Sequence, residues 1–92
     1  MSGAVTAAET LRDLVEFLAA SLVEEPGAVR VETAADAAAL RITLRVAAAD
    51  MGKVIGRQGR IARALRSVVR AAAARQGVRV LLDISSTGAG GA

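Results

Sequence analysis

The sequence contains no cysteine, no histidine, no tryptophan and no tyrosine, and each absence excludes some chemistry. Without cysteine there can be no disulfide and no thiolate metal site. Without histidine the chain lacks the usual general base and the commonest nitrogen ligand of zinc. We therefore expect no metal site and no cofactor.

The polar residues that are present do not form a recognisable catalytic set. Glu24 and Glu25 are adjacent at the expected end of a helix, so their carboxylates should be splayed apart and solvated. Ser67 has no base nearby in the sequence, and the Walker phosphate-binding pattern is absent. We predict that the chain is not an enzyme.

Long apolar runs are also missing, since none approaches the ~18 residues that span a bilayer. Residues 1–9 have neither the positive start nor the hydrophobic stretch of a signal peptide. A cytoplasmic location without membrane insertion is therefore expected. The length of 92 residues is enough for one domain, and the apolar fraction of 53% favours a folded chain over a disordered one.

Acidic residues are nearly absent from the second half of the chain. Residues 1–50 contain eight acids and four bases, a balance of −4, whereas residues 51–92 contain one acid, Asp83, and eight bases, a balance of +7. A region of one sign attracts a polyanion, either nucleic acid or an acidic membrane surface. The alternative is an ordinary solvated basic helix face. Insertion into a membrane is disfavoured because the face of Arg63, Arg66 and Arg70 lacks an apolar stripe.

The first half predicts one helix followed by two strands. A capping box at Thr6 and Glu9 precedes a helical apolar stripe, which favours a helix over about residues 7–24. Pro26 ends this helix. Alternation of apolar and polar residues predicts strands at Val29–Thr33 and Leu40–Val46, joined by a hairpin connection over residues 34–39. The stripe consists of Leu11, Leu14, Val15, Leu18 and Leu22.

The second half predicts two helices and a third strand. Asp50 is placed to cap a short helix, Met51 to Ile55, and a longer helix follows from about Arg60 to Gln76. Gly77 is suited to end it, and alternation over Val78 to Ile84 predicts a strand. The apolar side of the long helix is expected to consist of Ile61, Leu65, Val68 and Ala72 with Val69 beside them, and the opposite side of Arg63, Arg66 and Arg70.

The predicted order is α-β-β-α-α-β, an α+β fold with helices packed on one face of a three-stranded sheet. The domain is expected to span residues 7–85. It lies between a flexible N-terminus, residues 1–6, and a disordered Gly/Ala tail, residues 86–92.

The segment Gly56-Arg57-Gln58-Gly59 interrupts the two predicted helices. With 9 glycines in 92 residues, a Gly-x-x-Gly spacing is expected about once by chance, so its context must carry the argument. The glycines permit a sharp turn and have no Cβ that would obstruct a ligand approaching the backbone. The amides that open the next helix favour an anion, and Lys53, Arg57 and Arg60 flank the loop. Phosphate contact is favoured over a turn that uses glycine only for its geometry.

At this segment the chain resembles a known family. Asp50 to Ala62 is similar to the signature segment of a KH domain, and more narrowly to the small bacterial single-KH proteins of the KhpA (YlqC) family. The predicted element order is that of the type II, prokaryotic KH fold, so the resemblance covers about residues 8–84. In KH domains the Gly-x-x-Gly loop clamps the backbone of about four nucleotides of RNA.

The resemblance implies an RNA site, position by position. Gly56 and Gly59 would admit the RNA backbone, and Arg57 and Gln58 would lie along its phosphates. Lys53, Arg60 and Arg63 would add charge. An apolar floor under the bases would consist of Val54, Ile55, Ala62 and Leu65, with help from the strand Leu40–Val46. Ala62 stands where many KH domains have a larger aliphatic residue, so either Ile61 or Ala62 would line the groove.

The resemblance also implies partners. KhpA proteins self-associate and pair with a larger KH-domain protein in RNA regulation and cell-envelope control, so a dimeric RNA chaperone or post-transcriptional regulator affecting cell shape and cell wall organisation is expected. The alternative is an adaptor that stabilises a partner KH protein and has little RNA affinity of its own. Phe17, the only aromatic residue, either packs at an edge or contacts a partner chain. Without stacking residues, RNA affinity should be modest and sequence preference weak.

Overall fold

The computed structural model describes residues 6–35 and 37–87, and their elements form an α+β fold. The elements in chain order are α1 (Ala7–Leu22), the 3-10 turn η1 (Pro26–Ala28), β1 (Arg30–Ala35), β2 (Leu40–Val46), α2 (Ala48–Gln76) and β3 (Val80–Ser86). The predicted fold class is therefore confirmed. The two helices expected in the second half are the two parts of α2, which is interrupted at Gly56–Gly59.

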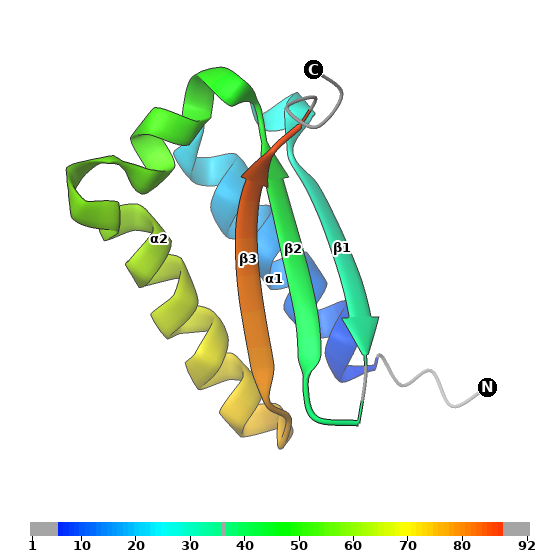
Figure 1. Ribbon diagram of the computed structural model, residues 1–92. Coiled ribbons are helices and arrows are strands. Elements are labelled where there is room, and N and C mark those ends of the chain that lie inside the picture. The colour runs from blue at the N-terminus through cyan, green and yellow to red at the C-terminus, as the bar shows by residue number, and fades with distance from the viewer. Residues whose placement is uncertain (1–5, 36, 88–92) are drawn as a thin grey trace.

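The three strands form one sheet in the order β1-β2-β3. β1 pairs with β2 antiparallel, with Arg30 opposite Arg45, and β2 pairs with β3 in parallel, with Leu40 opposite Val80. β2 is therefore the central strand, and β1 and β3 are the edges. Both helices cover one face of the sheet, and α2 runs beside β3 (Figure 1). The other face carries exposed residues such as Arg41 and Asp83, whose side chains form an ion pair at 2.9 Å.

The start of α1 is the one that the sequence predicts. The hydroxyl of Thr6 accepts a hydrogen bond from the Glu9 amide at 3.1 Å, and the Glu9 carboxylate accepts one from the Thr6 amide at 3.2 Å. The helix ends at Leu22, two residues earlier than predicted, because the chain becomes extended at Val23. The strand β3 continues through Ser86, one residue past the predicted end of the domain. Most of the predicted terminal segments, residues 1–5 and 88–92, lie outside the described residues.

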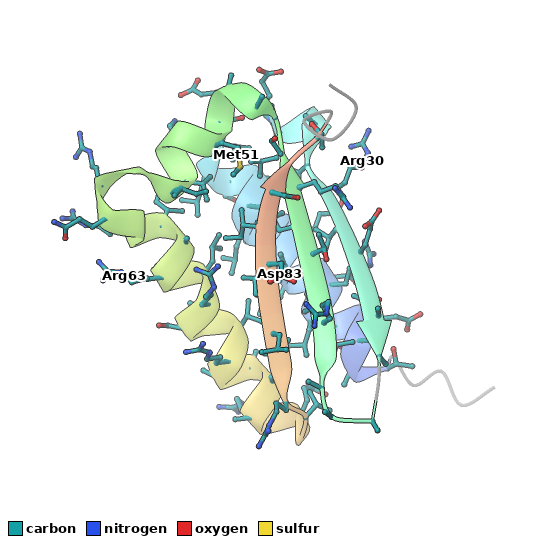
Figure 2. The ribbon with its side chains drawn as sticks, in the orientation of Figure 1. Arg30, Met51, Arg63 and Asp83 are labelled. Carbon is teal, nitrogen blue, oxygen red and sulfur yellow. The ribbon has the colours of Figure 1, made fainter. Side chains whose placement is uncertain are left out.

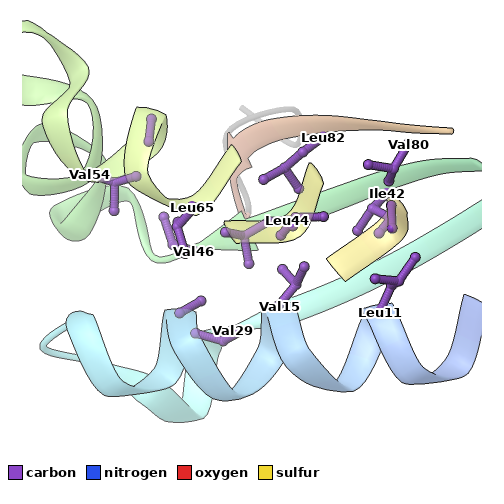
Figure 3. Packing of buried hydrophobic residues seen from close by; sticks show 14 of the residues in the cluster. Leu11, Val15, Val29, Ile42, Leu44, Val46, Val54, Leu65, Val80 and Leu82 are labelled. Carbon is purple, nitrogen blue, oxygen red and sulfur yellow. The ribbon is translucent and has the colours of Figure 1, made fainter. Parts of the chain in front are cut away.

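The core lies between the sheet and the two helices (Figure 3). Leu11 and Val15 of α1 face Ile42 and Leu44 of β2, and all four are fully buried. From the other side α2 and β3 complete the cluster, to which they contribute Val54, Ala62, Leu65, Val69, Ala73, Val80 and Leu82.

The buried face of the long part of α2 differs from the predicted one. Ala62, Leu65, Val69 and Ala73 are buried, whereas Val68 is 45% exposed and Ile61 is only partly buried. The apolar residues of this segment cover more than half of the helix circumference, so periodicity alone fits two rotations of the helix. The small alanines Ala62 and Ala73 allow α2 to pack close to the sheet, and the larger Ile61 and Val68 are turned toward the α1 side.

Candidate nucleic-acid interface

The loop between the two parts of α2 has an unusual backbone. Arg57, Gln58 and Gly59 all have positive φ angles, of 54°, 63° and 70°, in the left-handed region. Glycine adopts this region without strain, but arginine and glutamine rarely do. Such strained residues tend to occur at functional sites. The left-handed turn leaves the side chains of Arg57 and Gln58 exposed to solvent.

Open space lies above the glycines on both sides of this turn. A Cβ added at Gly52, Gly56 or Gly59 would meet no atom within 4 Å. Gly56 has φ −63°, which any residue adopts, so neither its conformation nor its neighbours require a glycine. The missing side chain instead leaves the backbone uncovered toward solvent. A hollow of about 480 Å³ adjoins this backbone, lined by Leu22, Gly52, Lys53, Gly56, Arg57, Arg60 and Ile61.

Within the described part of the chain, the arginines around and beyond the loop have no acidic partners. Among residues 6–35 and 37–87, the ion pairs of basic residues in the first half involve Arg12, Arg41 and Arg45. In the same ranges, none of the arginines of the second half pairs with a carboxylate. These are Arg57, Arg60, Arg63, Arg66, Arg70, Arg75 and Arg79. The positive charge near the loop is therefore not neutralised within the described chain, and it is available to an anion.

Lys53 is the basic residue near the loop that does have a partner. Its ammonium lies 2.8 Å from the carboxylate of Glu24, in the segment that follows α1. This hydrogen bond raises the pKa of Lys53 above its ordinary value, with a smaller contribution from the charge of Asp50. Lys53 is therefore fully charged at neutral pH. Because Glu24 and Lys53 are both exposed, a phosphate could replace the carboxylate without leaving a buried charge.

Asp50 has a different role from the predicted helix cap. The N-cap of α2 is Ala47, which makes no side-chain hydrogen bond, and the helix begins two residues before Asp50. The carboxylate of Asp50 is buried and accepts hydrogen bonds from the backbone amides of Glu24 and Glu25, at 2.9 and 3.1 Å. Asp50 thus joins the segment after α1 to the start of α2. This link also holds Glu24 beside Lys53.

The predicted apolar floor needs a correction. Val54, Ala62 and Leu65 are 1%, 4% and 3% exposed, so they belong to the core and support the loop from below. Ile55, at 48% exposed, is the predicted floor residue that a base could touch directly. Between the two candidates for the groove, Ile61 lines the hollow beside the loop and Ala62 faces the core.

The strand predicted to contribute to the apolar floor under the bases is β2. It is the central strand of the sheet, and its apolar side chains are buried. The strand that lies beside α2 is β3, which the sequence reasoning did not place at the site. The carbonyl of Arg79 accepts a hydrogen bond from the Leu40 amide on β2. Because backbone groups alternate along a strand, those of Leu82 point to the free edge. The carbonyl of Leu82 there accepts a hydrogen bond from Nε of Arg66 at 3.3 Å.

The remaining predicted site residues are exposed on α2. Arg60 lines the hollow beside the loop, together with Lys53 and Arg57. Arg63 extends outward from α2, away from β3 in the view of Figure 2. The structure thus brings together the two glycines with Lys53, Arg57 and Arg60, and places Gln58, Ile55 and Arg63 beside them. No signal in the sequence identified Glu24 or the β3 edge, because both depend on contacts between distant segments.

Comparison with known proteins agrees with this architecture. The family model described as KhpA/KhpB, KH domain, matches residues 12–84 of the chain. The chain belongs to this KhpA/KhpB family of KH domains. A relative from Halalkalibacterium halodurans, named RNA-binding protein KhpA, is 55% identical over 74 residues, which cover 80% of this chain and 97% of that protein. Proteins of the same name from Clostridium perfringens and Aquifex aeolicus are 45% and 47% identical, over 80% of this chain and 99% and 94% of their own lengths.

No solved structure gives a significant match to this KH domain. The KhpA/KhpB family is not an enzyme family, and membership supports the prediction that the chain is not an enzyme. Within the described ranges no group of acidic side chains could hold a metal ion. In those ranges no helix is both long and apolar enough to cross a membrane.

Proposed function

We propose that this KH domain binds single-stranded RNA and grips the backbone of about four nucleotides at Gly56–Gly59. The observation that carries the proposal is the uncovered, left-handed loop among arginines that have no acidic partner within residues 6–35 and 37–87. A neutral ligand would gain little from such a surface, whereas a chain of phosphates matches its charge. The relatives named RNA-binding protein KhpA support the same assignment.

Each part of the site has a distinct role in this proposal. Gly56 and Gly59 let the RNA backbone approach the protein backbone closely, and Arg57 and Gln58 contact the phosphates. Arg60 and Arg63 add charge on the following turn of α2, and Lys53 joins them by exchanging Glu24 for a phosphate. Ile55 contacts a base. Since no aromatic residue stacks on the bases, binding depends mainly on the backbone and discriminates weakly between sequences.

A salt titration with labelled single-stranded RNA tests this electrostatic mechanism. Three to five phosphate contacts predict that log K falls with log salt with a slope of about −2 to −3.5. An oligonucleotide of the same length and different sequence should give nearly the same slope and affinity. A slope near zero would contradict binding through phosphates.

We further propose that two copies of the chain associate through the side of the molecule where α1 and α2 meet. An apolar hollow of about 240 Å³ lies there, lined by Leu18, Leu22, Arg60, Ile61, Ala64, Leu65 and Val68. Phe17 stands on the same helix as Leu18 and is 69% exposed, which leaves most of its ring available to a partner chain. A protruding aromatic residue and an apolar hollow on one chain suit a two-fold dimer, in which each copy fills the hollow of the other.

Sedimentation over a concentration series tests the dimer. The wild type should shift from monomer to dimer with rising concentration, and Phe17→Ser and Val68→Glu should each remain monomeric. Both residues are exposed, so neither substitution should unfold the chain. Leu81→Ser, an exposed apolar residue on the face of the sheet that the helices do not cover, serves as the control and should dimerise. A wild type that stays monomeric at every concentration would rule out self-association.

The wider role that we propose is a cytoplasmic RNA chaperone or post-transcriptional regulator, acting as this dimer or with a larger KH-domain protein. Doubling a site that grips few nucleotides raises the effective concentration of the second site and hence the affinity. The competing function is an adaptor with little RNA affinity. A loop variant that still pairs with a partner KH protein separates the two functions. If that variant loses RNA binding, still pairs with the partner KH protein and still supports post-transcriptional regulation in cells, the adaptor function is correct.

A further inference from the structure

The strand β1 forms the edge of the sheet that lies away from α2. The opposite edge, β3, runs beside α2 (Figure 1), and its Leu82 carbonyl accepts a hydrogen bond from Arg66. In the described ranges β1 pairs with β2 on one side, and no strand pairs with it on the other. The outer side of β1 is therefore a free strand edge.

Alternation along β2 shows which backbone groups of β1 bond within the sheet. The Leu40 amide donates to the Arg79 carbonyl, and the Val46 carbonyl accepts from the Thr87 amide, so the even-numbered residues of β2 bond on the side of β3. The odd-numbered residues of β2 therefore bond to β1. Their partners in β1 are Arg30, Glu32 and Ala34.

The other residues of β1, Val31, Thr33 and Ala35, direct their amides and carbonyls to the free edge. Within residues 6–35 and 37–87 these groups have no hydrogen-bond partner. Native proteins commonly block such an edge with proline, lysine or a bulge. β1 has none of these, and its residues from Thr33 to Ala35 are small and exposed. The edge can therefore accept another strand.

A second copy of β1 suits this edge when the two strands pair antiparallel about a two-fold axis. With Thr33 opposite Thr33 of the second copy, Val31 faces Ala35, and three facing pairs each exchange two hydrogen bonds. A register with Glu32 on the axis forms only two such pairs and sets two carboxylates opposite each other, which is destabilising. The first register instead sets Glu32 opposite Ala34.

We infer that β1 pairs with β1 of a second copy when both copies are held on one RNA strand, so that their sheets become continuous. This inference rests on the proposed RNA function and adds a protein contact at the sheet edge away from α2. A few backbone hydrogen bonds offset little more than the entropy lost on association, so free copies stay apart at this edge. Copies on one RNA have a high effective concentration, at which a weak contact forms.

This contact is separate from the dimer proposed above. The hollow that receives Phe17 is lined by residues of α1 and α2, and β1 contributes none. One molecule can therefore make both contacts. Phe17→Ser removes the first contact and allows the second to be measured by itself.

The chain contains no cysteine, so a single introduced cysteine reports the pairing directly. In the inferred register the two copies of residue 33 face each other at a Cα separation of about 5.5 Å, within disulfide range. The two copies of residue 32 are offset along the strands, which places them beyond that range. Both side chains are exposed, so neither substitution should unfold the chain.

Phe17→Ser/Thr33→Cys and Phe17→Ser/Glu32→Cys are treated with a mild oxidant in the presence of RNA. One RNA has four nucleotides and holds one copy, and the other has about 40 and holds several. On the long RNA, Thr33→Cys should give at least about fivefold more disulfide-linked dimer than Glu32→Cys. The four-nucleotide RNA should give little linked dimer with either variant.

Titration of the same two RNAs tests the backbone contact independently. Thr33→Pro removes an amide that bonds only at the free edge, so pairing with β2 remains. In the Phe17→Ser background, Thr33→Val should bind the long RNA cooperatively, whereas Thr33→Pro should bind it without cooperativity. Both should bind the four-nucleotide RNA equally.

Equal or greater crosslinking at position 32, or equal cooperativity in Thr33→Pro and Thr33→Val, would overturn the strand pairing while leaving the loop intact. Failure of the wild type to bind either RNA would overturn the proposed function and this inference with it.

Discussion

The two glycines of the loop have different physical reasons for being glycine. Gly59 has φ +70°, where any Cβ is strained, whereas Gly56 has φ −63° and open space above it. Gly59 is therefore needed by the turn itself. Gly56 is needed only if something approaches from outside, which makes it the more informative position.

Substitution of Gly56 by Ala should separate binding from stability. We expect the free energy of unfolding to be unchanged or slightly higher, because alanine fits this backbone and restricts the unfolded chain. RNA binding should weaken about tenfold, corresponding to roughly 1.4 kcal/mol. Urea denaturation and RNA titration measure the two effects. Gly59→Ala should instead destabilise the fold by about 1–2 kcal/mol. If Gly56→Ala binds RNA as well as the wild type, the proposal that the RNA backbone approaches the protein backbone closely at Gly56 is wrong.

Glu24 should weaken RNA binding, because its carboxylate forms an ion pair with the ammonium of Lys53 and so competes with a phosphate. Removing the carboxylate with Glu24→Gln leaves Lys53 available to a phosphate. We expect RNA affinity to rise by up to about fivefold, the range of an exposed ion pair. Glu25→Gln is the matched control, because Glu25 is exposed and its carboxylate forms no ion pair within residues 6–35 and 37–87. Equal effects of the two substitutions would show that only net charge matters.

At the scale of elements, the sequence predicted the helices and strands well but not how they face one another. The capping box, the strand Leu40–Val46 and the break at Gly56–Gly59 are local patterns, and the structure confirms each. The predicted rotation of α2 was wrong because apolar residues cover more than one face of the helix. Packing against α1 and the sheet decides which of these residues are buried. The β3 edge was missed because a strand's neighbours depend on pairing between distant segments.

Asp50 shows how a long-range contact replaces a local expectation. Its carboxylate binds two amides of the segment that follows α1, 25 and 26 residues earlier in the chain. Asp50→Ala would leave these amides without their partner in a partly buried setting. We expect a loss of about 2–4 kcal/mol in the free energy of unfolding, measured by urea denaturation with an unchanged m value. Asp50→Asn, which keeps one acceptor oxygen, should lose less. An Asp50→Ala variant as stable as the wild type would show that this junction contributes nothing.

For the whole molecule, the division of charge along the sequence becomes a division in space. The bases of the first half pair with acids or bind carbonyls, as Arg41 and Arg30 do. The arginines of the second half lie on α2 and at the start of β3 without acidic partners in the described ranges. The sequence predicted this surface from counts of charge alone. It could not predict that three of these arginines, Arg66, Arg70 and Arg79, line hollows beside β3.

The central claim is that the loop Gly56–Gly59 holds RNA, and a charge reversal within it tests this most directly. The chain supplies a matched control, because an Arg-Gln pair stands both in the loop, at 57–58, and at the exposed end of α2, at 75–76. Labelled single-stranded RNA is titrated against wild type, Arg57→Asp/Gln58→Asp and Arg75→Asp/Gln76→Asp, and circular dichroism establishes that all three fold.

Both variants change the net charge equally, so long-range attraction falls by a similar amount in each. The account predicts that the loop variant loses at least about tenfold in affinity and that the control stays close to the wild type. If the two variants bind equally well, RNA is held elsewhere on the basic surface and the loop is not the site.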